Sequence, residues 1–262
     1  KLVIMGLCAL HDLLPAKQLP VNIGPSLGGL FKGREDWLVK IREAMRNGRS
    51  NGVDATRVAL CGLCGIGKTQ LAVVYAHLFP HEHSALLLIR GNTPQDLENS
   101  LADLTVLLRL PQAESAVAKE RLDAALAWLD NADHRGWLLL VDNVDTDEAF
   151  HAVETLVKRL HYGHVIITSR IRNWPLYVKD LHLDVLPLVA AQEYLLETTA
   201  NCPRLADGRD AEVALVLAQD LGQLALALVQ ASATIRANSW TFDEYLEHWR
   251  TNRELVIDDP HY

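Results

Sequence analysis

Hydrophobic and polar positions follow one pattern up to about residue 187 and another after it. In the first part, short apolar runs predict strands, and apolar residues three or four positions apart predict the helices between them. We expect strands at Val58–Cys61, Ala85–Arg90, Trp137–Asp142, Val165–Thr168 and roughly His182–Val185. We expect helices that begin at Thr93-Pro94 and that span about Val117–Leu129 and Asp147–Leu160. Alternating strands and helices are typical of a parallel sheet flanked by helices.

The segment after Pro187 has helical patterns and no strand candidates. Its predicted helices are Ala190–Ala200, Asp210–Gly222, Leu224–Asn238 and Thr241–Arg250. Thr241 and Glu244 have the spacing of a capping box at the start of the last one. Prolines and glycines before Phe31 indicate a linker. We therefore expect a linker and N-terminal segment over 1–30, an α/β domain over 31–187 and a helical subdomain over 188–262.

The composition narrows the classes of function. The 262 residues carry a net charge of −8 and a pI near 5.7, which argues against direct binding of nucleic acid or of an anionic membrane. The longest apolar runs are strand-sized, and no signal peptide is recognisable, so we expect a cytoplasmic protein. The chain begins with Lys1, and we expect it to be a piece of a longer protein.

One eight-residue segment carries the strongest chemical signal. Gly62-Leu63-Cys64-Gly65-Ile66-Gly67-Lys68-Thr69 follows an apolar strand and precedes a helical pattern that begins at Gln70. This is the phosphate-binding loop of nucleotide-binding proteins, in which backbone N–H groups surround the phosphates. Lys68 would reach the β- and γ-phosphates, and the Thr69 hydroxyl would bind Mg²⁺. The sequence therefore predicts an α/β fold of the P-loop NTPase type, with about five parallel strands.

Two further strand ends supply the rest of such a site. Asp142 follows four buried aliphatic residues, at the carboxyl end of a strand where open α/β sheets bind ligands, and we expect it to hold Mg²⁺. Asn143 and Asp145 come next, and either could orient the attacking water. Arg170 follows the strand Val165–Thr168 and could sense the γ-phosphate and stabilise charge during transfer. A surface arginine without such a role is an equally open alternative for Arg170.

Some groups invite other chemistry. Cys61 and Cys64 form a C-x-x-C pair, but the pair overlaps the phosphate loop and no second pair follows, so we interpret it as a coincidence. His77, His81 and His83 are close in sequence without a matching carboxylate or cysteine cluster. We expect them on the solvated surface rather than around a metal ion.

With these residues in view, the chain resembles the NB-ARC branch of the STAND ATPases, the switch modules of immune and cell-death receptors. Five ordered motifs carry the resemblance: Phe31-Lys32-Gly33-Arg34-Glu35, Gly62 to Thr69, Leu138 to Asp142, Thr168-Ser169-Arg170 and Leu221 to Leu228. The resemblance implies that Phe31, Gly33 and Arg34 lie near the adenine and that Leu224 and Ala225 close over adenine and sugar. The whole expected nucleotide set is Phe31, Gly33, Arg34, Gly62, Gly65, Ile66, Gly67, Lys68, Thr69, Gln70, Leu224 and Ala225.

The resemblance also implies a biological role. Such proteins are similar to this chain in their core and add an effector domain before it and a winged-helix domain and a repeat sensor after it, tetratricopeptide repeats in the bacterial and fungal members that it most resembles. They hold ADP at rest and exchange it for ATP, after which they self-associate. We therefore expect an adenine-nucleotide switch in immunity or programmed cell death, with ATP or ADP and Mg²⁺ as cofactors.

Three residues depart from the family pattern. Cys64 replaces a glycine in the loop, which requires a negative φ at that position. Asn143 replaces the second acidic residue, so hydrolysis should be slow or depend on Asp145. Ala225 replaces the proline that packs on the nucleotide, so closure there should rely on backbone and apolar contact.

Two alternatives use the same loop. A P-loop phosphotransferase would need an arginine-bearing lid, and no Arg-rich insertion lies between the predicted strands. The core of a STAND-type transcriptional regulator is the other, and DNA binding would then lie in flanking domains because this segment is acidic.

Overall fold

The computed structural model describes residues 19–47, 55–201 and 208–257. Residues 1–18 of the expected N-terminal segment lie outside them. The chain divides into two compact units. The first, called here the sheet unit, contains Asp36–Leu63 and Lys68–Leu183 together with the segment before Gly28. The second, called here the helical unit, contains Gly28–Glu35, Cys64–Gly67 and Asp184–Tyr262.

A parallel sheet forms the centre of the sheet unit, which confirms the predicted fold class. In the part of the chain that the structure describes, five strands lie in the order β2-β3-β4-β1-β5. Their bounds are Ala55–Cys61 (β1), Leu86–Arg90 (β2), Leu138–Val144 (β3), Gly163–Ser169 (β4) and Lys179–His182 (β5). All pairings are parallel, and β4 lies between β1 and β3. The central strands are buried on both faces, which explains their unbroken apolar runs.

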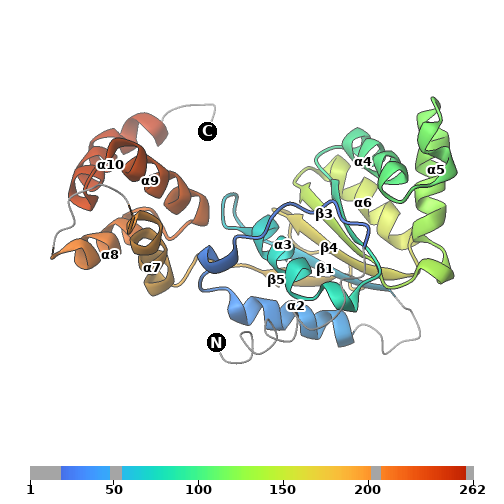
Figure 1. Ribbon diagram of the computed structural model, residues 1–262, viewed down its shortest axis with the longest axis horizontal. Coiled ribbons are helices and arrows are strands. Elements are labelled where there is room, and N and C mark those ends of the chain that lie inside the picture. The colour runs from blue at the N-terminus through green and yellow to red at the C-terminus, as the bar shows by residue number, and fades with distance from the viewer. Residues whose placement is uncertain (1–18, 48–54, 202–207, 258–262) are drawn as a thin grey trace. The chain divides into compact units, whose positions relative to one another are not determined.

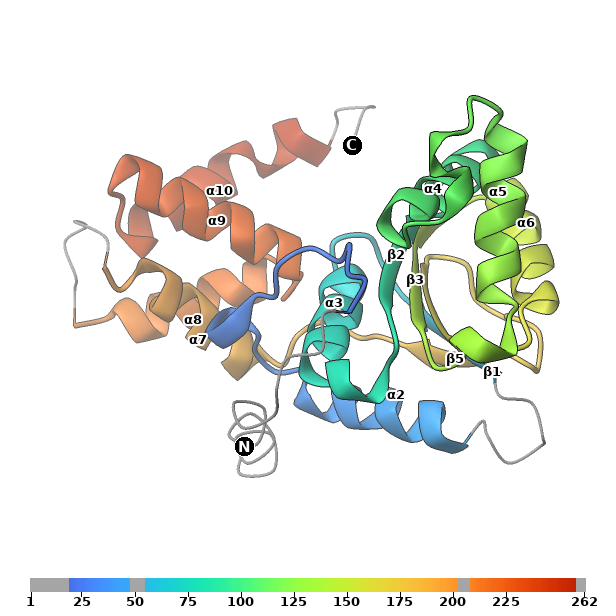
Figure 2. The same ribbon diagram turned by 45° about the vertical axis from the view of Figure 1, so that its right-hand side comes forward.

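Helices cover both faces of this sheet (Figure 1). The helices α4 (Pro94–Leu107), α5 (Ala118–Leu129) and α6 (Asp147–Arg159) lie on one face, and α2 (Glu35–Asn47) and α3 (Lys68–Leu78) lie on the other (Figure 2). Leu139 and Val141 of β3 face the first group and join one core with Leu101 and Leu129. The predicted start of α4 is confirmed, because Thr93 caps it by accepting a hydrogen bond from the Asp96 N–H. Four 3₁₀ turns also occur among the described residues: Gly28–Leu30, Pro80–Glu82, Pro111–Glu114 and Ala132–His134.

The two edge strands differ in how they are held. Pro20–Asn22 runs along β2: the Leu86 N–H donates to the Pro20 carbonyl, and the Asn22 side chain bonds both the N–H and the carbonyl of Leu88. At the other edge, the prediction of a strand over His182–Val185 was wrong. Instead, β5 is the more polar Lys179–His182, which pairs with Val58–Cys61 of β1. The ladder with a buried neighbour outweighed the higher β-propensity of the following residues.

The helical unit has a core of its own. Its helices are α7 (Leu188–Thr199), α8 (Asp210–Asp220), α9 (Ala225–Asn238) and α10 (Phe242–Ile257). Leu195, Leu217, Leu228 and Phe242 are among the fully buried side chains between them. The predicted capping box at α10 is confirmed: the Glu244 N–H donates to the Thr241 hydroxyl, and the Glu244 carboxylate accepts from the Thr241 N–H.

Candidate nucleotide-binding site

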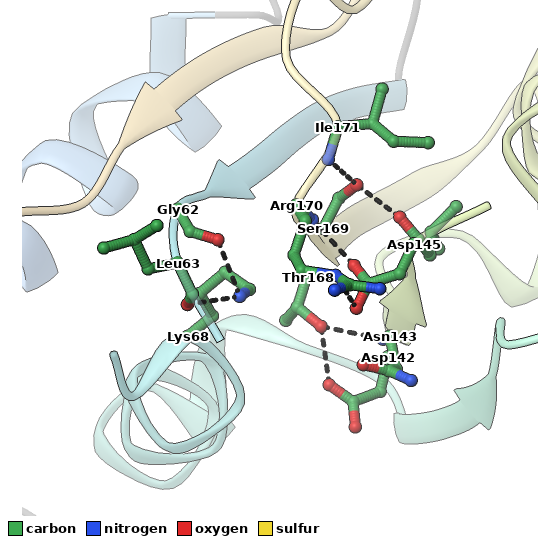
Figure 3. Close-up of polar contacts among 11 residues, drawn as sticks. Gly62, Leu63, Lys68, Asp142, Asn143, Asp145, Thr168, Ser169, Arg170 and Ile171 are labelled. Atoms are coloured by element: carbon green, nitrogen blue, oxygen red, sulfur yellow. Dashed lines mark hydrogen bonds and ion pairs between the residues drawn. The ribbon is translucent and has the colours of Figure 1, made fainter. Parts of the chain in front are cut away.

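The strand order gathers the predicted catalytic residues at one edge of the sheet. The strand β1 leads into the phosphate loop, β3 carries Asp142, and β4 between them leads to Arg170. Because all three strands are parallel, their carboxyl ends meet at the edge where open α/β sheets bind ligands. Figure 3 shows Lys68, Asp142, Asp145 and Arg170 around the end of β4.

The phosphate loop joins β1 to α3, which begins at Lys68, two residues before the predicted start. The Lys68 ammonium donates to the carbonyls of Gly62 and Leu63 at 3.0 and 2.9 Å. These bonds fold the lysine back over its own loop, where its charge faces the space that phosphates occupy in P-loop proteins. Gln70 is exposed in the first turn of α3. Together with the N-terminus of α3, Lys68 supplies the positive charge that an anion requires.

Asp142 joins the loop to the sheet. Its Oδ1 accepts the Thr69 hydroxyl at 2.6 Å and the Thr168 hydroxyl at 2.6 Å. Thr168 was not among the predicted site residues, although a threonine at the end of a buried strand is a detectable signal. Two hydroxyls on one carboxylate oxygen hold Asp142 in a single orientation and leave Oδ2 outside both bonds. A carboxylate and a hydroxyl are the oxygen donors that Mg²⁺ prefers.

The end of β3 is bulged. The β3–β4 register shifts between Val141 and Val144, and Asn143 has a φ of +67°. Asparagine tolerates this left-handed conformation better than most residues do. Asn143 thus has a local structural role in the backbone of the site.

Side chains replace the lost ladder bonds at this bulge (Figure 3). The Asn143 N–H donates to the Thr168 hydroxyl at 2.9 Å. The Ser169 hydroxyl donates to the Val144 carbonyl and accepts from the Ile171 N–H. These bonds hold the turn after β4 against the end of β3.

Arg170 and Asp145 form the last link between the two strand ends. Asp145 accepts the Arg170 backbone N–H on Oδ1 at 2.7 Å, and its Oδ2 forms an ion pair with the Arg170 Nε at 2.9 Å. The arginine side chain is 56% exposed and the aspartate side chain 13%. The structure thus brings Lys68, Thr69, Asp142, Asp145 and Arg170 to one edge, and it gives Asp145 an arginine partner that sequence reasoning missed.

Within the helical unit, a buried arginine holds the apex of the loop. The Arg34 guanidinium donates to the carbonyls of Ile66 and Asp184, and only 5% of Arg34 is exposed. Burial lowers the pKa of Arg34 from its usual value, and the nearby Asp184 opposes that shift. Arg34 therefore fixes the backbone of the loop apex, a contact that the motif alone does not reveal.

The other predicted adenine-side residues also belong to the helical unit. Gly65 accepts the Leu226 N–H at 2.9 Å, and a Cβ on Gly65 would stand 2.9 Å from the Leu226 Cβ, so only glycine fits there. A Cβ on Gly67 would lie 3.6 Å from that of Ala225. Phe31, Gly33 and Leu224 are half-buried, with Gly33 against Ala190 and Pro187. Their roles toward a nucleotide stay predictions.

The cysteines and histidines take different places. Cys64 is exposed and is not among the residues with positive φ, as the loop requires, whereas Cys61 is buried at the end of β1. Burial raises the pKa of the Cys61 thiol to about 12. The prediction of a surface position was wrong for His83, which is 7% exposed and lies edge-on against the buried His164. Among the described residues, no cluster of metal-binding side chains and no helix long and apolar enough to cross a membrane occurs.

The residues present fit a magnesium nucleotide. Gly65 and Gly67 leave the loop without side chains at two positions where a Cβ would lie against Leu226 and Ala225. Both glycines have a positive φ. Thr69 and Asp142 provide hard oxygen donors, and Lys68 provides charge beside them. When bound, Mg²⁺ would neutralise phosphate charge.

Comparison with known proteins points in the same direction. No protein-family model matches the chain. A nucleotide-binding leucine-rich repeat (NLR)-like protein of Hyaloscypha variabilis (strain UAMH 11265 / GT02V1 / F) is 23% identical over 265 residues, which cover 95% of this chain and 27% of that protein. The chain therefore spans about a quarter of the length of that relative.

Solved structures share the fold. A STAND protein with a tetratricopeptide repeat sensor from Pyrococcus horikoshii matches 81% of this chain and 30% of its own, with a TM-score of 0.50 and 20% identity. The chain shares the fold of this STAND protein. The Thermotoga maritima branch migration motor RuvB (TM-score 0.52, 15% identity, 87% and 72% of the two chains) has the same fold. Drosophila ORC bound to DNA also shares the fold (TM-score 0.56, 13% identity, 94% and 72%).

Proposed function

We propose that the chain is the nucleotide switch of a larger signalling protein, with ADP bound at rest and ATP bound in a self-associating state. The observation that carries the proposal is the joining of Thr69 of the phosphate loop to Asp142 of β3, with Lys68 and Arg170 at the same sheet edge. The NLR-like name of the fungal relative supports a role in immunity or programmed cell death. The resemblance further suggests effector, winged-helix and repeat sensor domains in the whole protein.

Each residue has a distinct part in this proposal. Lys68 binds the β- and γ-phosphates, while Thr69 and Asp142 hold Mg²⁺. Phe31, Gly33, Arg34, Leu224 and Ala225 surround the adenine and the sugar, as the family resemblance implies. Arg170 lies at the end of β4 and reads whether a γ-phosphate is present.

Slow hydrolysis follows from the groups near the γ-phosphate position. Asn143 carries no carboxylate, and both oxygens of Asp145 already accept bonds from Arg170. A site with a poor general base holds its nucleotide long enough to act as a switch. Its output depends on different affinities for ADP and ATP in the two states, because a nucleotide that bound both equally would shift nothing. We place the protein in the cytoplasm, where adenine nucleotides are abundant.

Calorimetry with ADP and with ATP in Mg²⁺ buffer tests the proposal. We expect binding of both nucleotides to the wild type and none that is measurable to Lys68→Ala. Lys179→Ala is the matched control, since Lys179 is an exposed lysine of β5 in the same sheet unit. Its affinity should equal that of the wild type.

Two outcomes would contradict the proposal. One is the failure of folded wild-type protein to bind any adenine nucleotide; the other is unchanged affinity in Lys68→Ala. Denaturing the purified wild type and identifying the released nucleotide then distinguishes an ADP-bound from an ATP-bound resting form. Light scattering of the full-length protein with each nucleotide tests self-association.

A further inference from the structure

Asp145 is the only carboxylate among the described residues that accepts both the backbone and the side chain of the predicted sensor arginine. Two roles are open to it at this edge of the sheet: a base that activates water, or a group that sets the position of Arg170. The two roles make different demands on the surroundings of the carboxylate. The hydrogen bonds around it decide between them.

The contacts of Asp145 with Arg170 do not involve the two terminal Nη groups of the guanidinium. They come from the Arg170 backbone N–H and from Nε, not from the terminal Nη groups. A guanidinium binds phosphate oxygens through parallel N–H groups in a planar fork. Asp145 thus fixes the backbone of Arg170 and the plane of its guanidinium, while the two Nη groups of Arg170 stay outside these contacts.

The neighbours of the pair make this arrangement rigid. Ser169 bonds to Val144 and Ile171 on one side, and Thr168 bonds to Asp142 and Asn143 on the other. The Arg170 backbone is therefore fixed to the same strand end that carries Asp142 (Figure 3). An arginine with 56% of its side chain exposed would otherwise sample many rotamers and lose entropy on binding.

We propose that Asp145 is a positioning residue that holds Arg170 ready for the γ-phosphate, and not the general base. This inference rests on the proposed nucleotide switch and names the residue that makes the switch distinguish ATP from ADP. Its side chain is only 13% exposed, which suits a group turned toward an arginine better than one that must bind a water molecule.

The test compares ADP with the non-hydrolysable ATP analogue AMP-PNP by calorimetry. We expect Arg170→Ala and Asp145→Ala each to weaken AMP-PNP binding by about tenfold, the scale of a charged hydrogen bond, with ADP binding within about twofold of the wild type. The double variant should be no weaker than Arg170→Ala alone, because the two residues act as one unit. Asp145→Asn keeps one acceptor oxygen and should be intermediate.

Asp130 provides a matched control. Its Oδ1 contacts the backbone N–H and the ring Nδ1 of His161 at 3.0 and 2.9 Å. His161 lies just before β4, at the edge of the sheet opposite to the phosphate loop. Asp130→Ala removes a similar pair away from the phosphate edge. It should change the unfolding midpoint without changing the ratio of AMP-PNP to ADP affinity.

The results separate this inference from the proposed function. Wild type that binds neither nucleotide would overturn both. Wild type that binds both, with Asp145→Ala equal to it in AMP-PNP affinity and additive with Arg170→Ala, would overturn only the positioning role. If Asp145 were the general base, Asp145→Ala would instead lower kcat for ATP at unchanged AMP-PNP affinity and would remove an ionisation from the pH profile of kcat.

Discussion

The Thr69 hydroxyl donates to Oδ1 of Asp142 over 2.6 Å and thereby joins the phosphate loop to the neighbouring end of β3. Both groups are magnesium ligands in the proposed site, and both come from segments more than seventy residues apart. Their bond holds the two ligands together before a metal ion arrives. Because this pair is already in place, we expect the affinity for nucleotide to depend on Mg²⁺.

We predict that Thr69→Val and Asp142→Asn remove the magnesium dependence of nucleotide binding. The wild type should bind ADP more tightly with Mg²⁺ than with EDTA. Each variant should bind equally in both buffers, because Thr69→Val removes an oxygen ligand and Asp142→Asn removes the negative charge that holds the cation. Calorimetry in paired buffers measures the effect. A variant that kept the full difference between the buffers would show that the ion is held elsewhere.

The bulge at Asn143 gives a prediction about stability. With φ at +67°, Asn143→Val should lower the free energy of unfolding by about 1–3 kcal/mol, since a β-branched residue resists the left-handed conformation. Asn143→Gly and Asn143→Asp should stay close to the wild type. Urea titration followed by circular dichroism compares the three. Equal midpoints for Val and Gly would mean that the bulge rearranges without cost.

Much of the site was predictable because its residues lie in motifs of fixed spacing. Lys68 and Thr69 come after the loop that follows β1, Asp142 lies near the end of β3, and parallel strand ends share one edge of the sheet. The order of the strands in the sheet, which the motifs do not give, determines which residues lie next to each of these groups. The hydroxyl of Thr168 reaches Asp142 only because β4 lies between β1 and β3.

Tertiary contacts account for what sequence reasoning missed. Nothing in the linear pattern around Lys179 or His83 indicates a strand or a buried ring. The strand β5 forms against β1, and His83 is buried against His164, which comes from another segment. The bond from Arg34 to the Ile66 carbonyl joins residues 32 positions apart. Local propensity carries no record of such partners.

The two cysteines of the C-x-x-C pair should differ in reactivity. In a background in which Cys8 and Cys202 are changed to serine, we predict that iodoacetamide at pH 8 modifies Cys64 and spares Cys61, because Cys61 is a buried neutral thiol. ADP should slow the reaction at Cys64, which lies in the phosphate loop. Peptide mapping by mass spectrometry locates the label, and equal labelling of both would contradict the burial of Cys61.

Cys61 also predicts a pH dependence of stability. Its pKa rises from an ordinary 9.0 to about 12 on folding, through burial first and the nearby Asp180 second. Between those pH values the folded state keeps a proton that the unfolded state has lost, so the free energy of unfolding falls as pH rises. Below about pH 9 the contribution is fully present. Cys61→Ala should lose this part of the slope, which urea midpoints at pH 8 and pH 10 measure.

Gly163, the first residue of β4, gives the sharpest test of the core. Its φ is +74°, and a Cβ there would stand 2.3–2.6 Å from ring atoms of Trp137. Trp137 is fully buried, and its Nε1 donates to the Leu129 carbonyl at 3.0 Å, so the ring has little room to move. Gly136 has a similar φ of +89° and open space around it, so it isolates the cost of the backbone conformation.

We therefore predict that Gly136→Ala lowers the free energy of unfolding by about 1–2 kcal/mol, the strain of a left-handed alanine. Gly163→Ala should lower it by about 1–3 kcal/mol more, because overpacking against Trp137 is added to the same strain. Urea unfolding followed by tryptophan fluorescence compares the two variants. Equal midpoints would show that the Trp137 ring moves aside without cost, and would contradict the inference that β4 packs closely against Trp137.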